Sequence, residues 1–530
     1  MALYLTGIAL LIFACVACSK ITGKLGIPML LAFIVLGMAL GSDGFFKIQF
    51  DNYNLAEKIC SFALIFIMFY GGFGTKLSEA KPVALRAVLL SSLGTVITAA
   101  LVGVFCHTVL KIELLESFLI GAVISSTDAA SVFSILRSKR LNLKYNTASL
   151  LEIESGSNDP FSYMLTAIIL SVMQGTSSGA GVLAMLLKQV VFGAICGVLL
   201  AFVSLWLLKR LKTLPSGFDA IFITGAAILS YALPTVLGGN GYLSVYITGI
   251  ILGNRRIANK KALVNFFDAA TLLMQMLLFF VLGLLAFPSQ LPHVAPEAIC
   301  ISLFLTFIAR PAAVFMLLAP FKSSIRQMLL VSWAGLRGAA SIVFAIMTVI
   351  HPSVLDNDIF HVVFFIVLFS ILLQGTLLPK IAKGLKLTDG DEDVMKTFND
   401  YIDEVPVRFI GFYVPEGHPW AGKRLKEILL PPESLLVLVV RNGEKYTPSG
   451  ETVIMAGDKL VLSGRSTDKM GEIELFEKEL LRGDSMIGKK ISELSGEAKL
   501  ITMIRRGNDV IIPKGSTTLE KGDILVINSD

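Results

Sequence analysis

The sequence has little charge, with only 16% of its 530 residues being Asp, Glu, Lys or Arg, whereas soluble proteins carry about 25%. It has five histidines, none at metal-ligand spacing, so it offers no resident metal site. It lacks a glycine-rich phosphate-binding motif, which argues against transport driven by ATP. The positive charges behind the net charge of +6 lie in short loops between apolar runs, and this does not indicate nucleic-acid binding.

Apolar sequence takes the place of charge, since 54% of the residues are hydrophobic. Thirteen runs are long enough to span a bilayer, at about 3–19, 26–41, 57–75, 84–109, 117–136, 147–173, 180–208, 217–237, 241–254, 268–288, 297–320, 326–350 and 359–382. The pattern predicts a polytopic α-helical membrane protein with about 13 transmembrane helices in the lipid bilayer.

Basic residues in the loops predict the orientation of these spans. Loops after odd-numbered spans are rich in Lys and Arg, as at 255–261, whereas loops after even-numbered spans hold few, such as Lys47 and Lys111. Positive charge marks the cytoplasmic side. The protein is therefore predicted to be multi-pass, with a periplasmic N-terminus and a cytoplasmic C-terminus.

Thirteen spans fit two groups of six with one span between them, and the second group then has the inverted orientation. Inverted six-helix repeats are common in secondary transporters, whose sites lie at broken helices. The fifth span is interrupted by Thr127 and Asp128, and the twelfth by the stretch 333–339, which contains Arg337. These two spans correspond in the repeat. We expect discontinuous helices that cross, with Asp128 and Arg337 neutralising the exposed helix ends.

A third polar stretch, Glu154 to Pro160, is predicted to lie about where the sixth helix begins. An ionised Asp at bilayer depth costs about 2.5–3.5 kcal/mol, so such a residue usually faces a watery cavity and binds something. Asp159 fits this description. Asp159 and Pro160 could also simply cap a helix start. A cap, however, does not require Asn158, Ser155 and a second polar segment around Asp128.

The sequence after residue 388 differs in character from the rest. An acidic stretch, 389–393, leads into a tail with a repeat of about 65 residues, most visible where 448–462 matches 513–527. Each copy has alternating β-type runs, a short helix-like segment and a Gly-Asp turn, which predicts two small cytoplasmic α+β domains. The expected divisions are 1–386 for the membrane domain, 387–402 for the linker, and 403–482 and 483–530 for the two repeats.

Four motifs together make the membrane part resemble the NhaP-type branch of the monovalent cation:proton antiporters, and they lie at 69–73, 127–130, 155–160 and 335–339. The tail resembles tandem RCK-C (TrkA-C) domains, and the whole is most similar to bacterial potassium/proton antiporters. The resemblance implies a homodimer in the bacterial inner membrane that serves pH and cation homeostasis. It also implies an ion- and proton-binding Asp159, completed or supported by Asn158, Ser155, Thr127 and Asp128. Arg337 would then balance charge.

Such a site suggests an exchange mechanism. Burial favours the protonated form of a carboxyl group and a bound cation favours the ionised form, so Asp159 can hold either ion but not both. With one titrating group, the simplest exchange is one cation for one proton, without net charge movement and without a cofactor. Many sodium-selective relatives carry Glu at the position of Tyr70, so this sequence favours potassium, with sodium or lithium as the alternative. The tail would respond to a small regulatory ligand, of nucleotide type or ionic.

Other interpretations remain beside this one. A ligand-gated cation channel would need rings of carbonyls or acids along a pore, and here the acids are few and local. A sensor that does not transport would not need the buried aspartates. Asp128 could serve only to stabilise a helix end, and Arg310 could pair with a carboxylate or extend toward the surface. Glu152 and Glu154, near the cytoplasmic end, could attract cations or simply be solvated, and solvation is the expectation.

Overall fold

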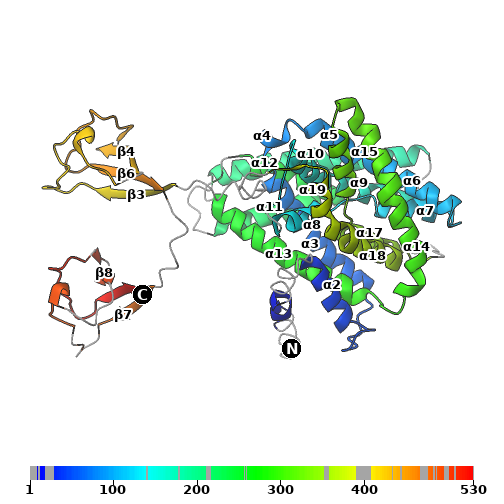
Figure 1. Cartoon of the computed structure of the whole chain (residues 1–530), viewed down its shortest axis with the longest axis horizontal. Helices are drawn as coiled ribbons and strands as arrows, with labels where there is room; N and C mark the ends of the chain where they lie inside the picture. The colour runs from blue at the N-terminus through cyan, green and yellow to red at the C-terminus, as the bar shows by residue number, and fades with distance from the viewer. Residues whose placement is uncertain are drawn as a thin grey trace. The chain divides into compact units, whose positions relative to one another are not determined.

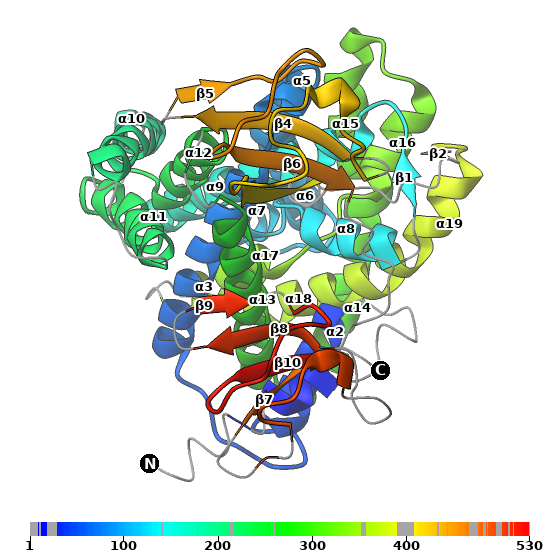
Figure 2. The same ribbon diagram turned by 90° about the vertical axis from the view of Figure 1, so that its left-hand side faces the viewer.

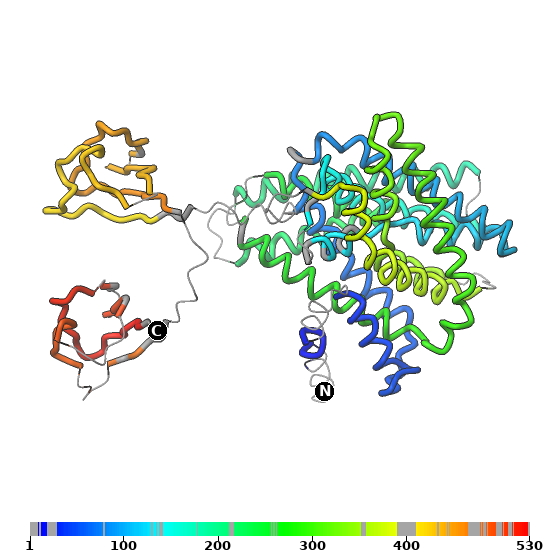
Figure 3. Tube along the Cα trace, in the orientation of Figure 1, coloured from blue at the N-terminus to red at the C-terminus, as the bar shows by residue number. Residues whose placement is uncertain are grey.

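The computed structural model divides the chain into a helical unit up to Asp403 and a second unit from Glu404 to Asp530 (Figures 1 and 3). It describes residues 9, 12–17, 29–138, 141–176, 179–210, 217–255, 257, 260–350, 357–389, 407–431, 434–441, 444–465, 475–480, 484, 486–493, 501–506, 509–511 and 513–528. Most of the first predicted span and the acidic residues 391–393 of the predicted linker lie outside the described residues.

Apolar helices make up most of the described part of the first unit. Seven are long and apolar enough to cross a membrane, and four shorter apolar helices lie among them. Each apolar run from the second to the thirteenth falls on one or more helices, so a polytopic helical fold is confirmed. The number of thirteen crossings and the inverted relation between the two groups stay predictions.

One group of helices, which we call the α3 bundle, packs around α3 (Tyr53–Gly74). Its other members are α2 (Met29–Leu40), α10 (Ala180–Arg210), α11 (Phe218–Val236), α12 (Gly241–Gly253) and α13 (Lys260–Leu285). Glycines allow the closest approaches. A Cβ atom on Gly249 of α12 would lie only 2.5 Å from the Phe69 carbonyl oxygen of α3. Small residues at such crossings let membrane helices pack backbone to backbone.

The other group, the α9 bundle, surrounds α9 (Thr147–Met173). It contains α5 (Ala84–Leu89), η1 (Leu90–Gly94), α6 (Thr95–Thr108), α7 (Leu114–Val123), α8 (Ala129–Ser138), α14 (Leu291–Phe304), η2 (Leu305–Ala309), α15 (Arg310–Leu318), η3 (Ala319–Phe321), α16 (Ile325–Trp333), α17 (Ala339–Ile350), α18 (Ile359–Phe369), η4 (Ser370–Gly375) and α19 (Thr376–Gly384). The π-helical segments η1, η2 and η4 join their neighbours into long rods. The short α4 (Leu77–Ala80) follows α3. The bundles meet where α3 contacts α17 and where α9 contacts α10 and α12.

Two helices of the α9 bundle are broken where the sequence predicts. α7 ends at Val123 and α8 begins at Ala129, and α16 ends at Trp333 before α17 begins at Ala339. The polar and glycine-containing stretches between them have no helical hydrogen bonding over most of their length. The prediction of discontinuous helices in the fifth and twelfth spans is therefore confirmed.

A two-stranded antiparallel ribbon closes the first unit. β1 (Asn142–Leu143), in the loop between α8 and α9, pairs with β2 (Thr388–Asp389), just after α19. The Lys144 amide also donates to the Leu387 carbonyl at 2.9 Å. The last described residues of the first unit are thus bonded to the loop that leads into α9.

The second unit contains two antiparallel four-stranded sheets with the same strand order (Figure 2). The first is β3–β6–β4–β5, formed by β3 (Val407–Tyr413), β4 (Ser434–Arg441), β5 (Glu444–Tyr446) and β6 (Lys459–Arg465). The second is β7–β10–β8–β9, formed by β7 (Leu475–Glu479), β8 (Ile501–Arg506), β9 (Asp509–Ile511) and β10 (Ile524–Asn528). This identity of order agrees with the repeat read from the sequence.

The predicted α+β character of the tail is wrong for its described part, which holds strands and 3₁₀ turns but no α-helix. The helix-like segments form the three-residue turns η6 (Leu425–Glu427) and η7 (Ile491–Glu493). The first residue of each turn donates its amide across the domain, Leu425 to the Thr452 carbonyl at 2.9 Å and Ile491 to Thr517 at 3.0 Å.

Each sheet holds a buried aspartate paired with an arginine in the same way. Asp458 accepts from Nε and Nη2 of Arg441 at 2.7 and 2.8 Å, and Asp523 accepts from the same atoms of Arg506 at 2.8 Å each. The hydrogen bonds from the guanidinium groups hold the pKa of Asp458 and of Asp523 below the ordinary value. The Gly-Asp turns seen in the sequence therefore anchor an arginine from a neighbouring strand.

Candidate functional site

The two broken helices cross at their interruptions, where backbone meets backbone. The Asp128 amide donates to the Leu336 carbonyl at 2.8 Å. A Cβ atom on Gly338 would lie 2.6 Å from Asp128 Oδ2, so only glycine fits at this position without displacing Asp128. The arrangement brings residues of α7, α8, α16 and α17 to one point in the α9 bundle.

The stretch 154–160 is not at the start of a helix, as the sequence analysis expected, but in the middle of α9, which runs unbroken from Thr147 to Met173. Pro160 lies inside that helix. A proline removes one helical hydrogen bond, and membrane helices tolerate this because neighbouring groups compensate. The interpretation of Asp159 and Pro160 as a helix cap is therefore wrong.

Hydrogen bonds join the middle of α9 to the break between α7 and α8. Ser126 Oγ donates to Asp159 Oδ1. Asn158 Nδ2 donates to Thr127 Oγ1 at 2.6 Å, and its Oδ1 accepts from the Thr127 amide at 3.3 Å. Ser155 Oγ donates to the Thr127 carbonyl at 2.7 Å. The structure thus brings Asp159, Asn158, Ser155 and Thr127 together, and Asn158 and Ser155 hold the break against α9.

Asp128 lies at the same break but makes different contacts. Its Oδ1 accepts from the Ser131 amide at 3.2 Å, and its Oδ2 accepts from Ser131 Oγ at 2.5 Å. These bonds cap the start of α8, as an N-terminal aspartate does. The side chain is nevertheless only partly buried and reaches the cavity described below. Its contacts support the helix-end role that the sequence analysis left open.

Arg337 is buried in the second break, with 1% of its surface exposed. Its Nη1 donates to the Ser126 carbonyl at 2.7 Å, and its amide donates to Ser370 Oγ at 3.1 Å. Ser126 is the residue whose hydroxyl bonds Asp159. Arg337 is therefore linked to Asp159 indirectly, through Ser126.

Glu154 and Arg310 form a buried ion pair, with Arg310 Nη2 at 2.6 Å from Glu154 Oε1 and side chains 3% and 1% exposed. The expectation that Glu154 is solvated is wrong, because this residue lies on a face of helix α9 that is buried in the surrounding helices. The pair also settles Arg310, which binds a carboxylate and does not extend to the surface. Arg337 interacts electrostatically with both residues, which makes Glu154 the nearby carboxylate for two buried arginines.

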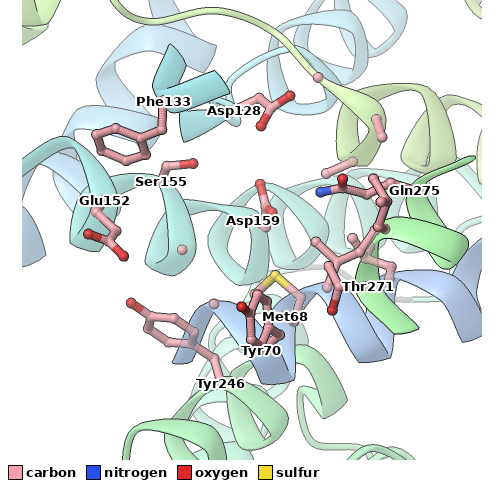
Figure 4. Close-up of a pocket in the computed structure, with 18 of the residues that line it drawn as sticks. Met68, Tyr70, Asp128, Phe133, Glu152, Ser155, Asp159, Tyr246, Thr271 and Gln275 are labelled. Atoms are coloured by element: carbon pink, nitrogen blue, oxygen red, sulfur yellow. The ribbon is translucent and has the colours of Figure 1, made fainter. Parts of the chain in front are cut away.

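A cavity of ≈ 510 Å³ lies between the two bundles and exposes Asp159 (Figure 4). Figure 4 shows Asp159 with Glu152 of α9, Tyr246 of α12 and Thr271 of α13 around the same space. From the α9 bundle come Ser126, Thr127, Asp128, Phe133, Glu152, Ser155, Gly156, Asp159, Gly338, Ala339 and Ala340. The α3 bundle supplies the other wall, from α2, α3, α12 and α13.

Sequence reasoning missed the polar wall of α13. Asn265, Asp268, Thr271 and Gln275 line the cavity at helical spacing, and Tyr70 Oη donates to Asp268 Oδ1 at 2.7 Å. Within an apolar run of this length, polar residues three or four apart indicate a wetted helix face. That spacing is the signal that could have found them. Asp268 gives the cavity a carboxylate facing the position where the sequence has Tyr70.

Comparison with known proteins shows which protein family this chain resembles in sequence. Residues 8–384 match the family described as "Sodium/hydrogen exchanger, transmembrane", and residues 409–470 and 475–528 each match the TrkA-C domain. The K(+)/H(+) antiporter NhaP2 of Shewanella oneidensis is 32% identical over 474 residues, which cover 88% of this chain and 82% of that protein. The K(+)/H(+) antiporter NhaP of Alkalimonas amylolytica is 33% identical over 467 residues, covering 87% and 81%.

Solved structures include a relative with the same helical fold. The sodium proton antiporter MjNhaP1 from Methanocaldococcus jannaschii superposes with a TM-score of 0.62 and 25% sequence identity. The match covers 70% of this chain and 99% of that chain. The coverage leaves the tail of this chain outside the similarity.

Proposed function

Because the chain belongs to the sodium/hydrogen exchanger family, whose members exchange cations for protons, we propose that it exchanges potassium for protons across the bacterial inner membrane. It is a transporter and not an enzyme. The choice of potassium rests on the two relatives named K(+)/H(+) antiporters, which this chain matches over most of its length. Sodium or lithium exchange is the alternative, favoured by the name of the structural relative MjNhaP1.

One observation carries the proposal: Asp159 reaches a cavity between two helix bundles and is held by the hydroxyl of Ser126. A carboxylate in that position can bind a proton, or it can bind a monovalent cation with Ser126 and nearby oxygens of Thr127 and Asp128. The two states exclude each other, which couples the movements of the two ions. Exchange follows if only the loaded forms cross between the two faces.

The contacts of the neighbours support a single titrating group. Asn158 is neutral, and both ends of its amide are bonded to Thr127, so it positions the break. Asp128 caps α8 and stays ionised in this scheme, and Arg337 balances charge through the Ser126 carbonyl. One proton then exchanges for one cation without net charge movement. An imposed membrane potential is expected to leave the exchange rate unchanged.

The loop charges supply the orientation, with the N-terminus periplasmic and the tail cytoplasmic. In this orientation the ends of α9 and α13 near Glu152 and Asn265 face the cytoplasm, so the cavity is open inward. The tail, divided as 403–482 and 483–530, would regulate exchange by binding a small nucleotide-type or ionic ligand. We further propose a homodimer, as the family resemblance implies.

Everted membrane vesicles with a pH-sensitive dye test the proposal. Potassium, rubidium, sodium and lithium are added in turn to vesicles with the parent protein, Asp159→Asn or Asp219→Asn. Asp219 begins α11 and does not line the cavity, so its variant is the matched control. Proton movement driven best by potassium, lost only in Asp159→Asn, is expected. A preference for sodium would mean that sodium, not potassium, is the exchanged cation. Activity that persists in Asp159→Asn would mean that the ion-binding site lies elsewhere. Cation flux without proton coupling would favour a channel.

A further inference from the structure

On three helices the lining of the cavity stops within about one turn of Asp159, whereas on α13 it continues to Phe279. On α9, Asp159 lines the cavity and Tyr163, four residues later, does not. On α12, Tyr246 lines it and Tyr242, one turn earlier, does not, and on α17 the lining stops at Ala340, four residues before Phe344. Each of these three helices thus carries an aromatic ring about one turn beyond its last residue that lines the cavity.

These rings form a continuous layer, which we call the ring layer: Tyr163, Tyr231, Tyr242 and Phe344. The Tyr163 ring meets Tyr242 edge to face at 5.1 Å between centroids, and both meet Phe344, at 5.8 and 6.2 Å. Tyr231 of α11 adds a fourth ring, 5.0 Å from Tyr242. Tyr242 and Phe344 are 1% and 0% exposed, whereas Tyr163 and Tyr231 are partly exposed, so the layer is most tightly closed at Tyr242 and Phe344.

The ring layer lies across the boundary between the two bundles. Tyr163 and Phe344 belong to the α9 bundle, and Tyr242 and Tyr231 belong to the α3 bundle. A hydrogen bond crosses the same boundary, since Asn240 Nδ2 donates to the Pro160 carbonyl at 2.8 Å. Pro160 directly follows Asp159. Any motion of the α9 bundle against the α3 bundle that exposes Asp159 on the other face must separate these contacts.

Polar side chains of α3 lie next to the layer. Glu57 of α3 accepts from Ser61 Oγ at 2.9 Å and interacts electrostatically with Tyr163 and Tyr231. Tyrosines bring hydroxyl groups to a layer that phenylalanine or leucine would fill equally well. A path that opened between the rings would therefore run from Asp159 past hydroxyl oxygens to a carboxylate, which suits a monovalent cation.

We propose that the ring layer, together with the Asn240–Pro160 hydrogen bond, is the gate that closes the far side of the Asp159 site. This inference rests on the proposed exchange, since a gate is needed only if Asp159 serves both faces. It assigns Tyr163, Tyr242, Phe344 and Asn240 as positioning residues that decide which face reaches the site. They do not bind the ion in the closed state.

Thiol labelling measures this access without requiring transport. A reporter cysteine, Gln275→Cys, is introduced in the full chain at a position of α13 that lines the cavity. Vesicles of both orientations are treated with a membrane-impermeant maleimide, and labelling of the chain without the reporter is subtracted. In the chain that carries only the reporter substitution, we expect the cysteine to react at least tenfold faster from the face at which the cavity opens.

Truncating the rings is expected to remove this asymmetry. Tyr242→Ala and, independently, Tyr163→Ala are expected to raise the rate from the far face at least tenfold. Tyr242→Phe, which keeps the ring, and Phe105→Ala, which truncates a ring stacked on Phe304 away from the cavity, are expected to keep labelling one-sided. Size-exclusion chromatography identifies the folded variants, and either ring truncation that folds suffices.

Two outcomes would overturn the gate. Equal labelling of the parent from both faces would mean that the layer does not close the site. One-sided labelling in a folded ring truncation would place the closure elsewhere. If the asymmetry behaves as expected while cation-driven proton movement is absent, the gate stands and the proposed exchange fails.

Discussion

Glu154 is the carboxylate near two buried arginines, Arg310 and Arg337. We therefore expect the loss of stability to depend on which of these residues is replaced. In Glu154→Gln, both Arg310 and Arg337 remain charged without their carboxylate, which is 0% exposed. Breaking a buried pair by removing one partner costs about 3–5 kcal/mol, because an uncompensated charge stays behind. We expect at least this loss for Glu154→Gln. In Arg310→Met, Glu154 loses its partner at 2.6 Å but keeps Arg337 within electrostatic range, so we expect a smaller loss than for Glu154→Gln.

The melting midpoint of the purified full chain in detergent, followed by size-exclusion chromatography, gives the order of the variants. A difference of about 2 °C for each kcal/mol is expected for a large chain, so Glu154→Gln should melt well below Arg310→Met. The double variant should be more stable than Glu154→Gln, because it removes one of the two unpaired cations. An Arg310→Met protein that is less stable than Glu154→Gln would refute the shared-carboxylate reasoning.

Further predictions concern other parts of the chain. Gly338→Ala places a methyl group against the side chain at the helix crossing and should lower the exchange rate at least tenfold, whereas Gly225→Ala, with open space around it, should not. Asp458→Asn should loosen the first tail domain by about 1.5–3 kcal/mol, seen as faster amide hydrogen exchange in 407–465. In the parent, the lowered pKa of Asp458 means that its contribution is present above the unfolded pKa of about 3.9 and is lost as the pH falls through the folded value, so protection there should decrease in acid. Tyr70→Glu adds a carboxylate to the cavity and should raise the sodium-driven rate relative to the potassium-driven rate in the vesicle assay.

The helix breaks could be predicted from the sequence because their residues disagree with their surroundings. Hydroxyls and a carboxylate at 125–131, and glycines with Arg337 at 333–339, interrupt apolar runs that would otherwise continue as helices. The tail repeat was visible because its turns recur at a fixed period. In both cases the signal is local, so no knowledge of distant partners is needed.

Features that depend on distant partners could not be predicted in this way. α9 continues through Pro160 because its neighbours hold it, although a proline after a polar stretch is also typical of a helix start. Glu154 finds Arg310 across 156 positions of sequence, and nothing local distinguishes a buried carboxylate from a solvated one. The same holds for the ring layer, whose members come from four different helices.

The β1–β2 ribbon connects the start of the linker to the loop before α9, the helix that carries Asp159. Asp389, the last described residue of the first unit, pairs with Asn142, and α9 begins only five residues after Asn142 at Thr147. A displacement of β2 would therefore be transmitted through β1 to the loop that leads into α9. If the tail regulates exchange as proposed, this pairing offers a mechanical route from the tail side of the unit to the helix that carries Asp159, with no contact at the cavity.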